Sequence, residues 1–240
     1  MILTEPLFQT APYQREAASR VLAHTPEGGI LCAASVFYPQ GGGQPGDSGQ
    51  LSWLGGQIEI ATAIKGMDGG VILVPAEPLP LPPVGMLVRQ SLDWERRHRH
   101  MRVHTALHLL SVLVPLPVTG GQIAADKGRL DFDMPEPPAD MAALEVALNA
   151  LVERDLPVTE TWITEAELDA NPGLVKTLSV KPPRGQDRIR LVRIGAGSDQ
   201  IDLQPCGGTH VARTGEIGIL RLGKVEKKGK QNRRLTVHLG

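Results

Sequence analysis

The chain has 240 residues, and its 25 lysines and arginines nearly balance 26 aspartates and glutamates. Hydrophobic residues make up 41% and charged residues 21%, which is typical of a globular protein and excludes extensive disorder. No apolar run approaches the roughly 20 residues that span a bilayer, and the first ten residues lack the basic cluster of a secretory signal. We therefore expect a cytoplasmic protein with no membrane partner.

Cys32 and Cys206 are the two cysteines of the chain. They are too few for a disulfide framework, so each is a candidate core thiol, metal ligand or nucleophile. Because the net charge is near zero, a polyanion would have to bind through local basic patches.

The first 92 residues have the pattern of a small β-barrel-like domain. Five prolines between residues 75 and 83 indicate an exposed connection, and the character of the sequence changes near Asp93. We expect strands at residues 29–38, 50–54, 57–64, 71–74 and 86–91.

Residues 93–240 are expected to form a second, α+β domain of two layers, with helices on one face of an antiparallel sheet. Helices are predicted at 94–113 and 139–153, and Thr164 with Glu167 forms a capping box that opens a short helix. Further strands are predicted at residues 158–163, 189–194, 218–225 and 235–238.

His104 and His108 lie four residues apart in the first predicted helix. This spacing places both imidazoles on one helix face, one turn apart, where they can bind one metal ion. Cys206 and His210 repeat the spacing in the sequence CGGTH, whose two glycines favour a tight loop over a helix. Both pairs arise together by chance in about one chain in a hundred, so we expect one zinc ion bound by three histidines and one cysteine.

The pattern leaves two kinds of zinc site open. Four bound side chains would make a closed, structural site, whereas one detached ligand would leave a position for water and permit catalysis. A zincin is disfavoured because Thr105, not glutamate, follows the first histidine. Cys206 could also be a nucleophile with His210 as its base, although a thiolate beside three histidines is better suited to bind metal.

A glycine cluster, GGGQPG, occupies residues 41–46 and formally contains the dinucleotide motif GxGxxG. A dinucleotide site needs a helix to begin there, but Pro45 and the residues after it lead toward another strand. The cluster is either a plain connection or a loop that closely approaches a ligand, and Gln44 is its polar side chain.

Two basic clusters offer sites for phosphate. Arginines at positions 96, 97, 99 and 102 precede the histidine pair, and they fit a solvated helix flank equally well. A second cluster near the C-terminus is opposed only by Glu226, and it either forms a solvated strand turn or contacts a nucleic-acid backbone. Its members are Lys224, Lys227, Lys228, Lys230, Arg233 and Arg234.

Three segments resemble the editing domains of alanyl-tRNA synthetases and the freestanding alanyl-tRNA editing proteins. MRVHTALHLL at residues 101–110 and PCGGTHVARTGEIG at residues 205–218 are similar to the two metal motifs of that family. FYPQGGGQPGDSG at residues 37–49 resembles its glycine-rich motif. The length is similar to that of freestanding members that combine the glycine-rich β domain with the editing domain.

The resemblance implies zinc on His104, His108 and Cys206, with His210 as the fourth motif residue. It also implies that Gln44 lies near the editing pocket and that Thr119 reads the hydroxyl group of the substrate.

The implied function is removal of a wrong amino acid, chiefly serine and also glycine, from tRNA(Ala), by an enzyme that needs neither ATP nor an obligate protein partner. Alternatives are editing of the threonyl-tRNA synthetase type, an RNA-binding module with a structural zinc, and a zinc hydrolase of small esters or amides.

Overall fold

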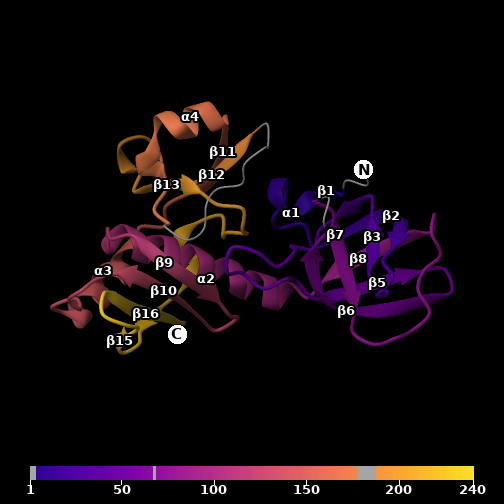
Figure 1. The fold of residues 1–240 in the computed structure, drawn as a ribbon, viewed down its shortest axis with the longest axis horizontal. Helices are drawn as coiled ribbons and strands as arrows, with labels where there is room; N and C mark the ends of the chain where they lie inside the picture. The colour runs from indigo at the N-terminus through magenta and orange to yellow at the C-terminus, as the bar shows by residue number, and fades with distance from the viewer. Residues whose placement is uncertain (1–3, 67–68, 178–187) are drawn as a thin grey trace. The chain divides into compact units, whose positions relative to one another are not determined.

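The computed structural model describes residues 4–66, 69–177 and 188–240, and the structural statements below refer to these residues. The chain divides into two compact units, Met1–Arg99 and His100–Gly240. Helix α2 (Trp94–Leu113) begins in the first unit and ends in the second (Figure 1). The assignment of separate functions to residues 1–92 and 93–240 stays a prediction.

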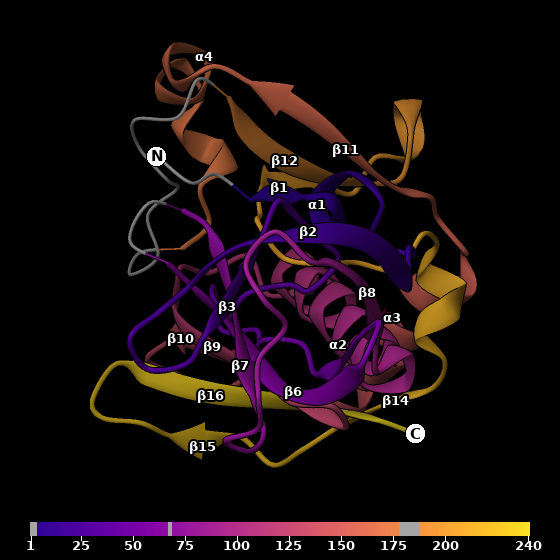
Figure 2. The same ribbon diagram turned by 90° about the vertical axis from the view of Figure 1, so that its right-hand side faces the viewer.

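The first unit is built around a closed antiparallel barrel of six strands, in the order β2, β3, β7, β6, β5, β8. Strand β5 is labelled in Figure 1 and the other strands also in Figure 2. A parallel pair of short strands, β1 and β4, lies outside the barrel. The elements are β1 (Glu5–Pro6), α1 (Leu7–Thr10), β2 (Glu16–His24), β3 (Ile30–Cys32), β4 (Ala34–Ser35), β5 (Gly49–Trp53), β6 (Gly56–Lys65), β7 (Val71–Pro75) and β8 (Leu87–Leu92).

Strand β6 shows how the sequence fills the barrel. Ile58 and Ile60 are buried, whereas Gln57 and Glu59 are exposed, as the alternation of side chains along a strand requires. A bulge between Ile60 and Thr62 shifts the register by one residue, and the next buried position is therefore Ala63.

Two strands of the barrel differ from the prediction. Strand β2 was not predicted, because Val21 and Leu22 are adjacent and the rest of the segment mixes alanine with polar residues, so apolar and polar residues do not alternate clearly. The single strand expected at residues 29–38 is broken: β3 belongs to the barrel, whereas β4 pairs with β1.

The glycine cluster forms a tight turn that leads into β5. Backbone hydrogen bonds run from Gly41 N to Gln44 O (3.0 Å) and from Gln44 N to Gly41 O (2.9 Å). A Cβ atom at Gly46 would lie 2.0 Å from the carbonyl oxygen of Ala63, so only glycine fits there.

A buried ion pair fixes this turn to the beginning of α2. Arg97 is fully buried, and its Nε donates to both carboxylate oxygens of Asp47, at 2.9 and 2.8 Å. Asp47 also accepts from Tyr38 N (2.6 Å), and Arg97 donates to the carbonyl of Val36. The pair therefore holds both ends of the glycine turn against the helix.

The second unit contains two antiparallel sheets, one formed by β14, β16, β10 and β9 with β15 beside β16, the other by β11, β12 and β13. Its helices and strands are β9 (Val118–Ile123), β10 (Lys127–Asp133), α3 (Met141–Glu153), β11 (Val158–Ile163), α4 (Glu165–Ala170), β12 (Ile189–Ile194), β13 (Asp202–Pro205), β14 (Leu220–Leu222), β15 (Glu226–Lys227) and β16 (Asn232–Leu239), with 3-10 turns at Pro172–Leu174, Gly197–Asp199 and Thr214–Ile217.

Helix α2 packs directly on β10. A Cβ atom at Gly128 would lie 2.5 Å from Val103 Cγ1, so the absence of a side chain lets the helix approach the strand. Leu130 and Phe132 are buried on the same face of β10. The neighbouring side of α2 carries His104 and His108, and the loop that follows β13 lies against that side.

The α+β fold with an N-terminal barrel is confirmed. Helix α2, strands β11 and β12, and the capping box of Thr164 and Glu167 lie where the sequence places them. The antiparallel sheet expected in the second half is present as two separate sheets. In the part of the chain that the structure describes, no helix is long and apolar enough to cross a membrane.

Candidate metal centre

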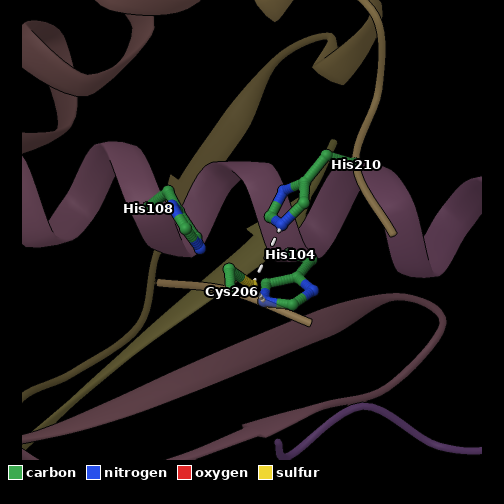
Figure 3. Close-up of side chains that lie close together, drawn as sticks. All are labelled: His104, His108, Cys206 and His210. Carbon is green, nitrogen blue, oxygen red and sulfur yellow. Dashed lines mark hydrogen bonds between the residues drawn. The ribbon is translucent and has the colours of Figure 1, made fainter. Parts of the chain in front are cut away.

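Four side chains from two distant segments converge in the second unit. His104 and His108 project from one side of α2, and Cys206 and His210 belong to the loop after β13 (Figure 3). The potential ligand atoms all lie within 4.8 Å of one another. Cys206 Sγ is 3.4 Å from His104 Nε2 and 3.3 Å from His210 Nε2. This arrangement suits one metal ion.

The charges of the cluster favour the metal-binding forms of two side chains. Burial alone would raise the pKa of Cys206, but the nearby imidazoles, His104 above all, hold that pKa well below its ordinary value. Burial and the charge of His104 keep the pKa of His210 well below its usual range. The thiolate and the neutral imidazole are the forms that bind metals.

His108 is oriented by strand β13. Its Nδ1 donates to Asp202 Oδ2 at 2.9 Å, and Asp202 Oδ1 accepts from Lys176 Nζ at 2.6 Å. Gln204 Nε2 donates to Asp202 Oδ2 at 2.7 Å. Burial alone would lower the pKa of His108, but hydrogen bonds with Asp202 and Cys206 raise it to about 9. Likewise, burial would raise the pKa of Asp202, yet His108 and Lys176 lower it to about 2.

Arg190 on β12 holds the CGGTH loop in place. Its Nη1 donates to the carbonyl oxygens of Cys206 and Gly208, both at 2.9 Å, and its Nε donates to Glu160 at 2.7 Å. The backbone of Arg190 accepts from Cys206 N at 3.2 Å. Three hydrogen bonds to the loop therefore fix the direction in which Cys206 presents its sulfur.

Comparison with known proteins identifies the family of the chain. Residues 189–236 match the family described as the threonyl and alanyl tRNA synthetase second additional domain. The chain is 31% identical over 243 residues to the alanyl-tRNA editing protein AlaX-M of Methanosarcina acetivorans, with 97% of this chain and 98% of the relative covered. For AlaX-M of Methanosarcina mazei the identity is 30%, with 99% and 97% covered.

The chain belongs to the alanyl-tRNA editing protein family. It is also 36% identical over 234 residues to an alanine–tRNA ligase of Pyrobaculum arsenaticum, of which it spans a quarter of the length, 25%. The resemblance that the sequence motifs suggested is thus confirmed.

The predicted metal ligands come together in one cluster, in which His104, His108 and His210 are buried and Cys206 is partly buried. Gln44 lies in the first unit, buried in the glycine turn. The functional role of each residue stays a prediction.

Thr119 occupies a bulge of β9. Gly120 pairs with Asp131 and Val118 pairs with Phe132, so Thr119 is the additional residue between them. Its hydroxyl lies within hydrogen-bonding distance of Asp131 O (3.1 Å) and Asn232 Oδ1 (3.3 Å). Bulges of this kind redirect a side chain, and they recur beside active sites.

The C-terminal basic cluster divides into two groups. Arg233 is buried and donates to the carbonyl of Pro135, and Arg234 donates to both oxygens of Asp131 at 2.7 and 2.9 Å. The lysines lie on and around β15, and all four are exposed: Lys224, Lys227, Lys228 and Lys230.

Sequence reasoning missed Asp202, Gln204 and Arg190. The alternation Asp202, Gln204, Cys206 places three polar residues on one face of a strand and its extension, and this signal was available. No sequence signal identified Arg190, whose contacts with the loop depend on the pairing of β12 with β13.

Proposed function

We propose that this protein is an aminoacyl-tRNA deacylase that edits in trans: it hydrolyses the ester of mischarged tRNA(Ala), chiefly Ser-tRNA(Ala), with one zinc ion. The convergence of His104, His108, Cys206 and His210 is the observation that carries the proposal. Membership of the alanyl-tRNA editing protein family supplies the substrate class. We place the activity in the cytoplasm and expect it to need neither ATP nor another protein.

The donor set supports zinc as the metal. Zinc takes imidazole nitrogen at about 2.0–2.1 Å and thiolate sulfur at about 2.3 Å, so tetrahedral ligands lie roughly 3.3–3.6 Å apart. The separations of 3.4 and 3.3 Å from Cys206 Sγ to His104 and His210 fit that spacing. When bound, zinc supplies Lewis acidity to the hydrolysis.

The residues of the chain would bind the metal, orient its ligands and select the substrate. An aminoacyl ester is already activated, so placing a water beside it can suffice without a covalent nucleophile. Cys206 is therefore assigned as a ligand, in agreement with the backbone hydrogen bonds that fix it to Arg190. Asp202 keeps His108 in one tautomer and one orientation.

Selection of serine over alanine is assigned to Thr119, with Gln44 as a second candidate. A synthetase pocket made for alanine rejects a side chain that merely adds a hydroxyl by about a hundredfold at most, so a second site must recognise that hydroxyl. The Thr119 hydroxyl has protein acceptors for its proton in Asp131 O and Asn232 Oδ1, and it would accept a hydrogen bond from serine.

The tRNA would be bound in part by the exposed lysines near β15. Phosphate groups favour such clusters, and the contacts carry no sequence information. Arg233 and Arg234 would stabilise the pair of strands β15 and β16 instead of binding tRNA, because both donate hydrogen bonds to acceptors of the protein.

The decisive experiment measures deacylation of tRNA(Ala) charged separately with serine, glycine, alanine and threonine, without ATP. We expect rapid loss of serine, slower loss of glycine, and little loss of alanine. Equal cleavage of the serine and alanine esters would reject the editing function. Binding without any cleavage would favour the RNA-binding module, and preference for tRNA(Thr) carrying serine would favour editing of the threonyl type.

A further inference from the structure

Thr105 lies between the two histidines of α2 and is fully buried. Its Oγ1 has three polar neighbours. It donates to the carbonyl oxygen of Met101 at 2.9 Å, it accepts from Val211 N at 3.3 Å, and it lies 3.1 Å from His210 Nδ1. The side chain thus joins the histidine helix directly to the CGGTH loop.

Counting protons assigns the direction of the last contact. A hydroxyl has one proton and two lone pairs, and a carbonyl oxygen can only accept. The 2.9 Å contact with Met101 O therefore requires the threonine proton, since two oxygens without a shared proton would repel each other at that distance. Val211 N–H takes one lone pair of Oγ1, and the other can receive a proton only from His210 Nδ1.

This assignment determines what His210 presents to the cluster. A neutral imidazole that carries its proton on Nδ1 has a lone pair on Nε2. His210 Nε2 is the atom that lies 3.3 Å from Cys206 Sγ. His210 therefore presents the lone pair of Nε2 to the cluster.

We infer that Thr105 is a positioning residue that fixes the tautomer of His210, so that Nε2 presents its lone pair to the metal site. The inference rests on the metal site of the proposed function and adds a residue that orients one of its ligands.

The test uses zinc affinity, measured by competition with a chromogenic chelator, in the full-length protein. Thr105→Val keeps the shape of the side chain and removes the hydroxyl, whereas Thr105→Ser keeps the hydroxyl. We expect Thr105→Val to weaken zinc binding about 10- to 100-fold, the usual effect of losing a hydrogen bond to a ligand histidine, and Thr105→Ser to restore most of the affinity.

Two further variants separate positioning from packing. In the His210→Gln background, Thr105→Val should cause no additional loss, because the ligand through which Thr105 acts is already gone. Thr214→Val is the matched control: it removes another buried threonine hydroxyl, which accepts from Leu156 N and lies near the carbonyls of Leu151 and Val152, and it should lower thermal stability without changing zinc affinity.

Three results would overturn the inference: wild-type affinity in Thr105→Val, an equal loss in the His210→Gln background, or failure of Thr105→Ser to restore binding. A wild-type protein that binds no zinc would refute it as well. Zinc binding with the expected Thr105 effects but without deacylation would reject only the enzymatic function.

Discussion

His108 Nδ1 donates to Asp202 Oδ2 at 2.9 Å, and the same carboxylate accepts from Lys176 and Gln204. The Asp202 side chain is completely buried, so its charge is balanced by these donors alone among the described residues. Asp202→Asn should weaken zinc binding about 10- to 100-fold, because an amide is a poorer acceptor for the His108 proton and lowers the donor strength of the opposite nitrogen. Chelator competition measures the change.

Lys176→Met is the companion variant for this prediction. It leaves the bond between Asp202 and His108 in place and removes a partly exposed ammonium group, so its effect on zinc affinity should be smaller. If Asp202→Asn binds zinc as the wild type does, the carboxylate does not orient the ligand.

Replacement of Cys206 separates a metal ligand from a nucleophile. Cys206→Ala should lose zinc and all deacylation, and chelation of the wild type should have the same effect, reversed by added zinc. Cys206→His supplies another zinc ligand but no thiol, so partial recovery of both zinc binding and activity is expected from a ligand role. Zinc content is measured by elemental analysis. A metal-free wild type with full activity would exclude a catalytic metal.

The cluster of His104, His108, Cys206 and His210 could be largely predicted because local spacing encodes half of it. Four residues make one helical turn, so the pattern of His104 and His108 already specifies a shared face. Cys206 and His210 needed only the assumption of a tight loop. The residues that orient these ligands could not be predicted in the same way, since Asp202 lies 94 residues from His108 and reaches it only through tertiary packing.

In the fold, too, features set by neighbouring residues were predicted, whereas features set by residues far apart in the sequence were not. The capping box of Thr164 and Glu167 is a local pattern, and it was predicted correctly. Strand β2 was missed, because its place in the barrel depends on pairing with β8, as between Glu16 and Ser91, and not on its own weak alternation. A barrel closes through pairs of strands that are far apart in the sequence, and local patterns do not reveal these pairs.

The exposed lysines should make tRNA binding depend on salt. Each bound phosphate releases counterions, so the logarithm of affinity falls as the logarithm of salt concentration rises. Replacing Lys227, Lys228 and Lys230 by glutamine should make this slope shallower by about one for each phosphate that is no longer bound. Arg221→Gln, an exposed arginine paired with Glu145, is the control. A slope equal to that of the wild type would mean that these lysines are exposed to solvent and do not contact the tRNA backbone.

The ion pairs that Asp131 forms with Arg234 and Arg129 predict how the free energy of unfolding varies with pH. Hydrogen bonds from Arg234 and Arg129 lower the pKa of Asp131 in the folded protein. A depressed pKa adds stability that is complete above the unfolded value of about 3.9 and is lost as the pH falls through the folded value. Asp131→Asn should therefore destabilise the protein by about 1 kcal/mol at pH 7, and the difference should disappear in acid.

Urea titrations of both proteins between pH 7 and pH 3 measure this difference. Arg234→Gln should show a smaller loss with the same pH dependence, since Arg129 still pairs with Asp131. A difference that persists unchanged at pH 3 would show that Asp131 acts through packing and not through its charge.

Thr119 is expected to determine the choice between serine and alanine. A hydroxyl of the protein that pairs with serine loses that partner when alanine is bound, at a cost of about 1 to 3 kcal/mol. Thr119→Val keeps the shape and removes the hydroxyl, so serine removal should slow toward the alanine rate while zinc content stays the same.

Because Thr119 also contacts Asp131 O and Asn232, thermal unfolding must be compared in parallel. Asn232→Ala removes one of those contacts but leaves the hydroxyl, and it should keep serine selectivity. An unchanged ratio of serine to alanine cleavage in Thr119→Val would transfer the role to another residue, with Gln44→Ala the next variant to measure.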